Sequence, residues 1–310
     1  MSAQDWILPG LARRETGENG LPRIAVNTPL AEAHLYFHGA HLTYFRPKSG
    51  PSTTPCLFMS GSSWFAAGRP IRGGIPVVFP WFGRRRDDPA APQHGFARLR
   101  EWSLRGAAPQ PDGAVAVVLA LESDAETRSL WPHDFRLELR VVVGNSLLVE
   151  LRATNLSPSA FTFEEALHTY LAVADVRQVV VQGFHGPFAD TSGGGWKIRQ
   201  EAEGPVRLAA ETDRIYLGHR NRIVVQDPTG KRALAVEREG SDAAVLWNPW
   251  IAKAKAMPDF GDDEWPFMLC VEAGNVADCA VTLPPGATHR LATRLLSEPL
   301  PSEGRATSRG

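Results

Sequence analysis

The sequence predicts an all-β protein, one large antiparallel β-sandwich, and three observations support this. Short apolar runs alternate with polar residues at a period of two, which is typical of strands with one buried face. The 28 glycines and 25 prolines make up 17% of the 310 residues, against a background of about 12%, and this excess favours turns over helices. Helix-length patterns do not separate the runs, so successive strands should pair antiparallel through short turns.

The clearest element is a hairpin in the middle of the chain. Residues 135–143 alternate apolar with charged side chains, a Gly-Asn-Ser turn follows, and residues 147–152 alternate again. Turn signals such as Asp112-Gly113 and Pro284-Pro285-Gly286 separate other apolar runs. These runs predict further strands at residues 34–46, 114–122, 168–173, 177–183, 222–227, 232–237, 267–273, 277–283 and 288–295.

One short helix is predicted between the strands. Ser123 and Glu126 have the spacing of a capping box, and Pro132 ends the helix after Trp131. We expect residues 1–20 to be a frayed N-terminal segment and residues 301–310 to be a disordered tail. Residues 21–300 are then a single β-sandwich domain.

Charge and hydropathy exclude several classes of protein. With 33 basic and 34 acidic side chains the net charge is −1, which argues against a nucleic-acid-binding protein and a polybasic membrane binder. No apolar run reaches the roughly 18 residues of a membrane helix, and the N-terminus lacks the pattern of a secretory signal. Cys56, Cys270 and Cys279 are odd in number and lack CxxC spacing, so we expect a reducing, cytoplasmic location.

The nine histidines do not have the spacing of a metal site. His34, His38 and His41 are the closest group. On a strand, His34 and His38 would share a face about 13 Å apart, at ~3.3 Å per residue. That is too far for both to bind one ion at ~2.1 Å. We therefore expect no metal and interpret these histidines as strand-packing or surface residues.

Residues 69–105 differ from the rest of the chain in charge. They contain eight arginines and three acidic residues, a local balance of +5. Because guanidinium groups match the geometry of phosphate and carboxylate, this segment predicts an anion site, with a solvated basic loop as the alternative. Arg72 and Arg98 are set among glycine and apolar residues, where a charged side chain is costly to bury without a ligand or partner.

The same segment carries a resemblance to a known family. The strings IRGGIPVVFPWFG (71–83) and QHGFAR (93–98), with Trp102, are similar to the glucose-6-phosphate 1-epimerase (hexose-6-phosphate mutarotase) branch of the aldose 1-epimerase family. Further blocks follow in the family's order: SLWPHDF (129–135), ALHTYLAV (166–173), ETDRIYLG (211–218), WNPW with KAKAMPDFGDDE (247–264) and MLCVEAGNV (268–276). Together they cover nearly the whole chain.

The resemblance implies a fold, a reaction and a set of residues. The fold is the galactose-mutarotase type of antiparallel β-sandwich. The reaction is interconversion of the α and β anomers of a hexose 6-phosphate, most of all glucose 6-phosphate, without a cofactor; we also expect a monomer. The residues that match the family's motifs are Glu272 as general base, His168 as general acid, and Arg72, His94, Asp213, Gln93 and Arg98 as substrate-binding residues.

One loop departs from the family's pattern. Members often carry an Asp-Lys pair before the TDRIY block, whereas here the loop reads PFADTSGGGWK, with Thr191 where the lysine would fall. Either a cation is missing at this place or Lys197 or an arginine substitutes for it, and the phosphate-binding set is left open.

Anomer interconversion suits a carboxylate and an imidazole. One group takes the proton of the C1 hydroxyl while the other protonates the ring oxygen; the ring opens, the aldehyde end rotates, and closure reverses the roles. The environment must then raise the pKa of Glu272 and keep His168 charged. Glu272 shares a strand face with Met268 and Cys270, where loss of water should raise its pKa. The structural alternatives are a water-facing Glu272 and a core His168.

Two other functions remain open on the same scaffold. One is a non-catalytic sugar-phosphate binding protein, and one is a mutarotase of unphosphorylated aldoses. A glycoside hydrolase would need Glu272 paired with Glu164 or Glu165 across a glycosidic bond, and the sequence does not place them so. The presence of both Glu272 and His168 favours catalysis, and the arginine-rich segment favours a phosphorylated sugar.

Overall fold

A computed structural model describes residues 6–85 and 87–301, and β-strands dominate it. The first sheet follows chain order: β1 (Trp6–Leu8), β2 (Ala12–Thr16), β3 (Pro22–Asn27), β4 (Ala31–Tyr36) and β5 (Leu42–Pro47). The second, here called the long sheet, has the order β14 (Val180–Gln182), β18 (Ile223–Asp227), β19 (Arg232–Glu239), β23 (Thr288–Glu298), β10 (Leu147–Asn155), β9 (Phe135–Val143), β8 (Val115–Glu122) and β7 (Ser103–Pro109).

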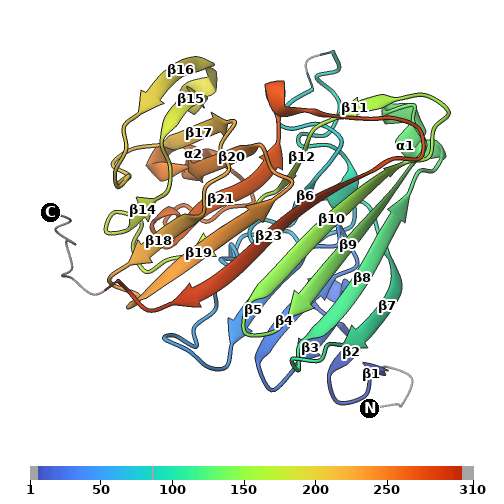
Figure 1. Cartoon of the computed structure of the whole chain (residues 1–310), viewed down its shortest axis with the longest axis horizontal. Helices are drawn as coiled ribbons and strands as arrows, with labels where there is room; N and C mark the ends of the chain where they lie inside the picture. The colour runs from blue at the N-terminus through green and yellow to red at the C-terminus, as the bar shows by residue number, and fades with distance from the viewer. Residues whose placement is uncertain (1–5, 86, 302–310) are drawn as a thin grey trace, which may run out of the picture.

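A third sheet, here called the site sheet, carries the residues that matter for function. Its order is β16 (Lys197–Glu201), β15 (Gly186–Asp190), β17 (Thr212–Leu217), β20 (Ala243–Asn248), β21 (Met268–Asn275), β12 (Glu165–Leu167) and β6 (Val77–Val78), with β13 (Tyr170–Ala172) also paired to β21. A separate pair is formed by β11 (Phe161–Phe163) and β22 (Val281–Leu283). Figure 1 shows the long strands of the long sheet running side by side across the molecule. The predicted all-β sandwich is confirmed.

Burial alternates along the strands as the period-two pattern predicts. In β9 the apolar residues are buried at alternate positions, while Arg136, Glu138 and Arg140 lie between them, less buried. β9 pairs with β10 from Phe135 opposite Asn155 to Val143 opposite Leu147, which confirms the predicted hairpin. The buried side chains of the sheets join in one continuous apolar cluster.

Two predicted features at helix and chain ends are wrong. The helix α1 (Ala125–Leu130) is capped by Asp124, whose carboxylate accepts from Thr127 N at 2.7 Å, while Thr127 Oγ1 accepts from Asp124 N at 2.8 Å. Ser123 cannot be the cap because its N–H still donates to Phe135 O across the sheet, at 3.0 Å. Residues 6–16, expected to be frayed, form β1 and β2, because β2 pairs along its length with β3.

Other differences concern short elements. The predicted strand at residues 34–46 is the end of β4 and most of β5, joined by a tight turn. A second helix, α2 (Trp250–Ala256), follows β20 and was not predicted. The expected C-terminal tail lies outside the described residues, except for Pro301. Within the described ranges no helix is long and apolar enough to cross a membrane.

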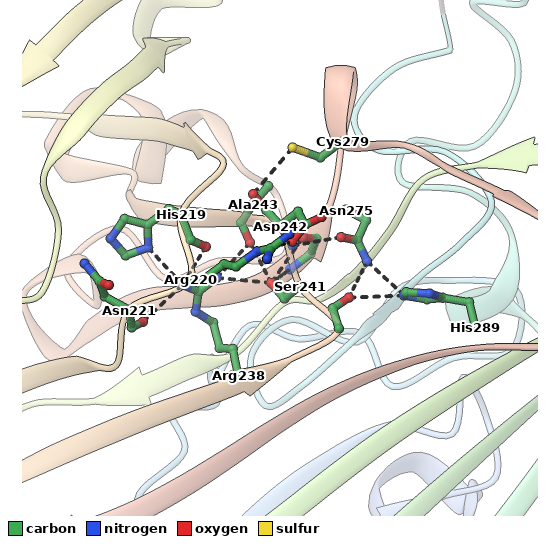
Figure 2. A network of polar contacts seen from close by, with 12 residues as sticks. His219, Arg220, Asn221, Arg238, Ser241, Asp242, Ala243, Asn275, Cys279 and His289 are labelled. Carbon is green, nitrogen blue, oxygen red and sulfur yellow. Dashed lines mark hydrogen bonds and ion pairs between the residues drawn. The ribbon is translucent and has the colours of Figure 1, made fainter.

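A polar cluster joins the site sheet to the long sheet at one end (Figure 2). Ser241 Oγ donates to Ala243 O at 2.7 Å, and Asn275 Nδ2 donates to Gly240 O at 2.7 Å. His289, at the start of β23, lies 2.9 Å from the fully buried carboxylate of Glu165. A cavity of about 530 Å³ lies beside these groups. Because Asn275 is an odd number of residues from Glu272, its side chain points to the opposite face of β21.

The ion pair between His289 and Glu165 should make stability depend on pH. Burial acts to lower the pKa of His289, but the hydrogen bond to Glu165 and the charge of that carboxylate raise it overall. A raised folded-state pKa stabilises the fold below the usual histidine range, and this contribution is lost as the pH rises through the folded-state value. We expect His289→Asn to lower the Tm more at about pH 5.5 than at about pH 8.5, measured by thermal denaturation. Equal losses at both pH values would contradict this assignment.

Candidate active site

Three neighbouring strands bring polar residues to one face of the site sheet. Asp213 of β17 is opposite Trp247 of β20, Trp247 is opposite Cys270 of β21, and Glu272 lies two residues further along β21. Alternate residues of a strand face the same side, so the side chains of Asp213, Trp247 and Glu272 share one face. That is the face predicted from Met268 and Cys270.

His168 lies against Glu272. It sits between β12 and β13, where its N–H donates to Pro76 O at 3.1 Å. Its Nε2 is 3.4 Å from Glu272 Oε1, and the two residues are 7% and 1% exposed. The ring of Tyr170 stacks on the imidazole, with centroids 4.7 Å apart and planes 10° apart. The two groups assigned to proton transfer therefore form a buried, oriented pair.

Burial acts on both members of this pair. Burial first, and then the charge of Asp213, raise the pKa of Glu272 well above its usual value. Burial, followed by the charges of Arg98 and Arg72, lowers the pKa of His168 well below its usual value. The raised pKa of Glu272 confirms the prediction. The expectation that the environment keeps His168 charged is wrong, because two guanidinium groups and the loss of water oppose a further positive charge.

His94 reaches the site from a strained turn. Its φ is +63°, and its backbone and ring are both bonded to Gly83: His94 N donates to Gly83 O at 2.7 Å, and Gly83 N donates to His94 Nδ1 at 3.2 Å. Because Nδ1 accepts, the neutral ring carries its proton on Nε2. The imidazole lies 5.8 Å from that of His168, centroid to centroid. His94 is thus placed to donate a hydrogen bond to a ligand.

The glycine after His94 has a structural reason. Gly95 has φ +74°, and a Cβ there would lie 1.9 Å from Phe79 O. Only glycine avoids that clash with the backbone. The His-Gly sequence therefore fixes the direction in which His94 leaves the turn.

Arg98 is a buried cation with little compensation. It lies in a short 3-10 turn (Ala97–Leu99), is 7% exposed, and donates from Nη2 to Gln93 O at 2.6 Å. Across residues 6–85 and 87–301 its guanidinium forms no ion pair. Burial and the charge of Arg72 lower its pKa to about 10. Such a group would be stabilised by a bound anion.

Arg72 is held by two acceptors. Its Nη2 donates to both carboxylate oxygens of Asp259, at 3.0 and 3.2 Å, and its Nη1 donates to Tyr170 Oη at 3.0 Å. Gln93, by contrast, is exposed, and its amide nitrogen lies 3.4 Å from His94 Nε2. Gln93 therefore occupies the rim of the site.

The cation beside Asp213 is a lysine that we did not predict. Lys253 of α2 lies 3.4 Å from Asp213 Oδ2 and 3.2 Å from Glu211 Oε1. Burial raises the pKa of Asp213, and Lys253 acts against this. Thr191 is uncharged and donates from N and Oγ1 to Asp213 O, at 2.8 and 3.2 Å. The predicted substitute Lys197 is exposed on β16. Where the loop differs from the family's pattern, the cation beside Asp213 is therefore Lys253 of α2.

Several buried polar atoms in this cluster have no partner. Within the described residues they are His41 Nδ1, Arg72 Nε, Arg98 Nε, His168 Nδ1 and Glu272 Oε2. Buried polar atoms in folded proteins are nearly always hydrogen-bonded. Five of the eleven such atoms within the described residues lie in this cluster, which indicates a site suited to a polar ligand.

The carboxylates required for a glycoside hydrolase are engaged elsewhere. Glu164 accepts from Phe82 N at 2.8 Å and from the N–H of Ala277. Glu165 pairs with His289 and is opposite Asn275 in the ladder, on the face of the sheet away from Glu272. Neither is placed to act across a bond from Glu272.

Comparison with known proteins agrees with this geometry. The sequence profile of the aldose 1-epimerase family matches residues 22–296. The chain belongs to the aldose 1-epimerase family. Its sheets superpose on a solved mutarotase-like member from Salmonella typhimurium, with a TM-score of 0.87 and 30% identity over 95% of this chain and 96% of that one.

Two curated relatives of this epimerase are named "Putative glucose-6-phosphate 1-epimerase". The protein from Cenchrus ciliaris is 36% identical over 83% of this chain and 79% of its own length. The protein from Escherichia coli K12 is 34% identical over 88% of this chain and 89% of its own length. The resemblance predicted from the motifs is therefore confirmed for the family and for most of the chain.

Sequence reasoning missed three residues of the epimerase site: Tyr170, Lys253 and Asp259. All three lie inside motifs that carried the resemblance, ALHTYLAV and KAKAMPDFGDDE. The motifs could have directed attention to them. Their contacts could not be predicted, because Asp259 and Arg72 are 187 residues apart.

Proposed function

We propose that this epimerase interconverts the α and β anomers of a hexose 6-phosphate, with glucose 6-phosphate as its substrate. The buried pair of Glu272 and His168, 3.4 Å apart beside the guanidinium groups of Arg72 and Arg98, carries the proposal. The names of the two curated relatives support the choice of sugar. The reaction breaks and reforms the bond between C1 and the ring oxygen with two proton transfers, so it requires neither electron nor hydride transfer.

In this mechanism one proton first passes from Glu272 to His168 Nε2, 3.4 Å away, which gives the carboxylate and the imidazolium that the reaction needs. Glu272 then accepts the proton of the C1 hydroxyl while His168 protonates the ring oxygen and the bond from C1 to that oxygen breaks. Ring opening then leaves a protonated Glu272 and a neutral His168, which are the forms that burial favours. Rotation about the C1–C2 bond turns the aldehyde. On closure Glu272 returns its proton to the carbonyl oxygen. His168 takes the proton of the hydroxyl that was formed from the ring oxygen, and that oxygen attacks C1 again. Closure therefore restores the carboxylate of Glu272 and the imidazolium of His168, and one proton can return from His168 to Glu272 across the 3.4 Å between them.

The other residues hold the sugar. We assign the phosphate to the arginine-rich side of the site, with Arg72 and Arg98 as its cations. His94 donates from Nε2 to a sugar oxygen, Asp213 accepts from a hydroxyl, and Gln93 contacts the substrate from the rim. Burial of the guanidinium groups strengthens their pairing with an anion.

The phosphate requirement is tested by comparing substrates. We expect kcat/KM for glucose 6-phosphate to exceed that for glucose by about 10²-fold or more, because one or two charge-assisted pairs contribute about 1.5–3 kcal/mol each. The measurement is the rate of equilibration of freshly dissolved α anomers, by polarimetry or a coupled anomer-specific assay. Equal values for the two sugars would indicate a mutarotase of unphosphorylated aldoses. Tight binding of glucose 6-phosphate without turnover would indicate a non-catalytic binding protein.

We further propose that the epimerase acts as a monomer in the cytoplasm. The site described above is assembled from side chains of a single chain. The three cysteines are free. Sedimentation at working concentration tests the oligomeric state.

A further inference from the structure

The carboxylate of Asp259 is the counter-charge of the substrate arginine Arg72. Asp259 is 3% exposed, and Arg72 Nη2 donates to both of its oxygens. The second donor, Nη1, is directed to Tyr170 Oη, whereas Nε is buried without a partner. Two of the three guanidinium nitrogens are therefore fixed, and the third is left for another group.

The loop that carries Asp259 is anchored to the segment before Arg72. The ring of Phe260 lies 5.7 Å from that of Phe58, and Gly261 N donates to Ser60 Oγ at 3.2 Å. Ser60 N in turn donates to Arg72 O at 3.1 Å. The carboxylate and the guanidinium are thus positioned by the same short stretch of chain, which limits their relative movement.

The contact continues to the proton-transfer pair. Tyr170 accepts from Arg72 and stacks on the imidazole of His168. Arg98 lies close enough for the charge of Arg72 to lower the pKa of Arg98. The carboxylate of Asp259 offsets the repulsion between these two buried guanidinium groups. Without it, the Arg72 side chain would be more stable turned toward water.

We propose that Asp259 is a positioning residue that holds Arg72 in place for the substrate. This rests on the proposed function, in which Arg72 binds the sugar phosphate. Asp259 itself does not touch the reacting atoms. Its effect should therefore depend on the presence of Arg72.

A double-mutant cycle tests this dependence. Asp259→Asn keeps the size of the side chain and removes its charge. We expect it to raise KM for glucose 6-phosphate, and Kd by calorimetry, by about tenfold or more, with kcat changed by less than about threefold. In the Arg72→Ala background the same substitution should change KM by less than about twofold, because the group it positions is gone. Asp242→Asn makes the same substitution in an exposed pair with Arg220 outside the site; it is the control for loss of an aspartate charge and should leave KM unchanged.

Other outcomes overturn the proposal. Equal fold-changes from Asp259→Asn in the wild-type and Arg72→Ala backgrounds would show that Asp259 acts independently of Arg72. A fall in kcat at constant KM would do the same. Should Asp259→Asn not fold, Tyr170→Phe removes the other acceptor of Arg72 and should raise KM in the wild type but not in Arg72→Ala; equal effects would again contradict it. If the wild-type protein converts glucose 6-phosphate but the effects of the two substitutions are independent, only the role of Asp259 is overturned. If the wild-type protein neither binds nor converts glucose 6-phosphate, the proposed function is overturned as well.

Discussion

Glu272→Gln should lower kcat by about 10²–10⁴-fold while Kd for glucose 6-phosphate changes little, because a general base contributes that much to the rate. Glutamine preserves the size and hydrogen bonds of the side chain but cannot accept the proton. The substitution also replaces a buried acid with a neutral group, so the fold should be retained. The measurement is a coupled anomer assay for kcat with calorimetry for Kd.

The pH profile distinguishes a base from a merely structural carboxyl group. Burial and Asp213 raise the pKa of Glu272, so the carboxylate form is lost as the pH falls through a value above the usual glutamate range. Wild-type kcat should fall with it, and Glu272→Gln should lack this acid limb. Glu239→Gln, at an exposed pair with Arg290, is the control. A folded Glu272→Gln protein with near wild-type kcat would exclude Glu272 as the base and make Asp213 the next candidate.

His168→Asn should lower kcat by a similar factor, about 10²–10⁴-fold, because it removes the proton donor to the ring oxygen. The loss should also change the titration of Glu272, since two groups 3.4 Å apart titrate as a pair. We expect the remaining activity to show one ionisation instead of two in its pH profile.

The control for this variant is His133→Asn, because His133 makes an edge-on contact with Trp131 away from the site. Circular dichroism establishes that each variant is folded. Combining His168→Asn with Glu272→Gln should cost little more than either alone, since the two groups act as a unit. Losses that multiply would instead indicate that His168 and Glu272 act in separate steps.

Local pattern was sufficient for the strands that pair as simple hairpins. The alternation in residues 135–152 is a property of neighbouring residues, and the faces it predicts are those of β9 and β10. The same reasoning placed Glu272 on the face of Cys270 in β21. Two short elements escaped it: β12 has three residues and β6 has two, too few for a period to be recognised.

The sequence by itself determined the fold class, the family and the choice of candidate site residues. Alternation depends on adjacent residues, and motifs depend on their order, so both can be read along the chain. Only the tertiary structure decided which charged side chains contact one another. Asp259 reaches Arg72, and Lys253 reaches Asp213, through contacts between distant segments. The protonation of His168 was decided there too, because a pKa depends on burial and on every nearby charge, and these exist only once the sheets have packed.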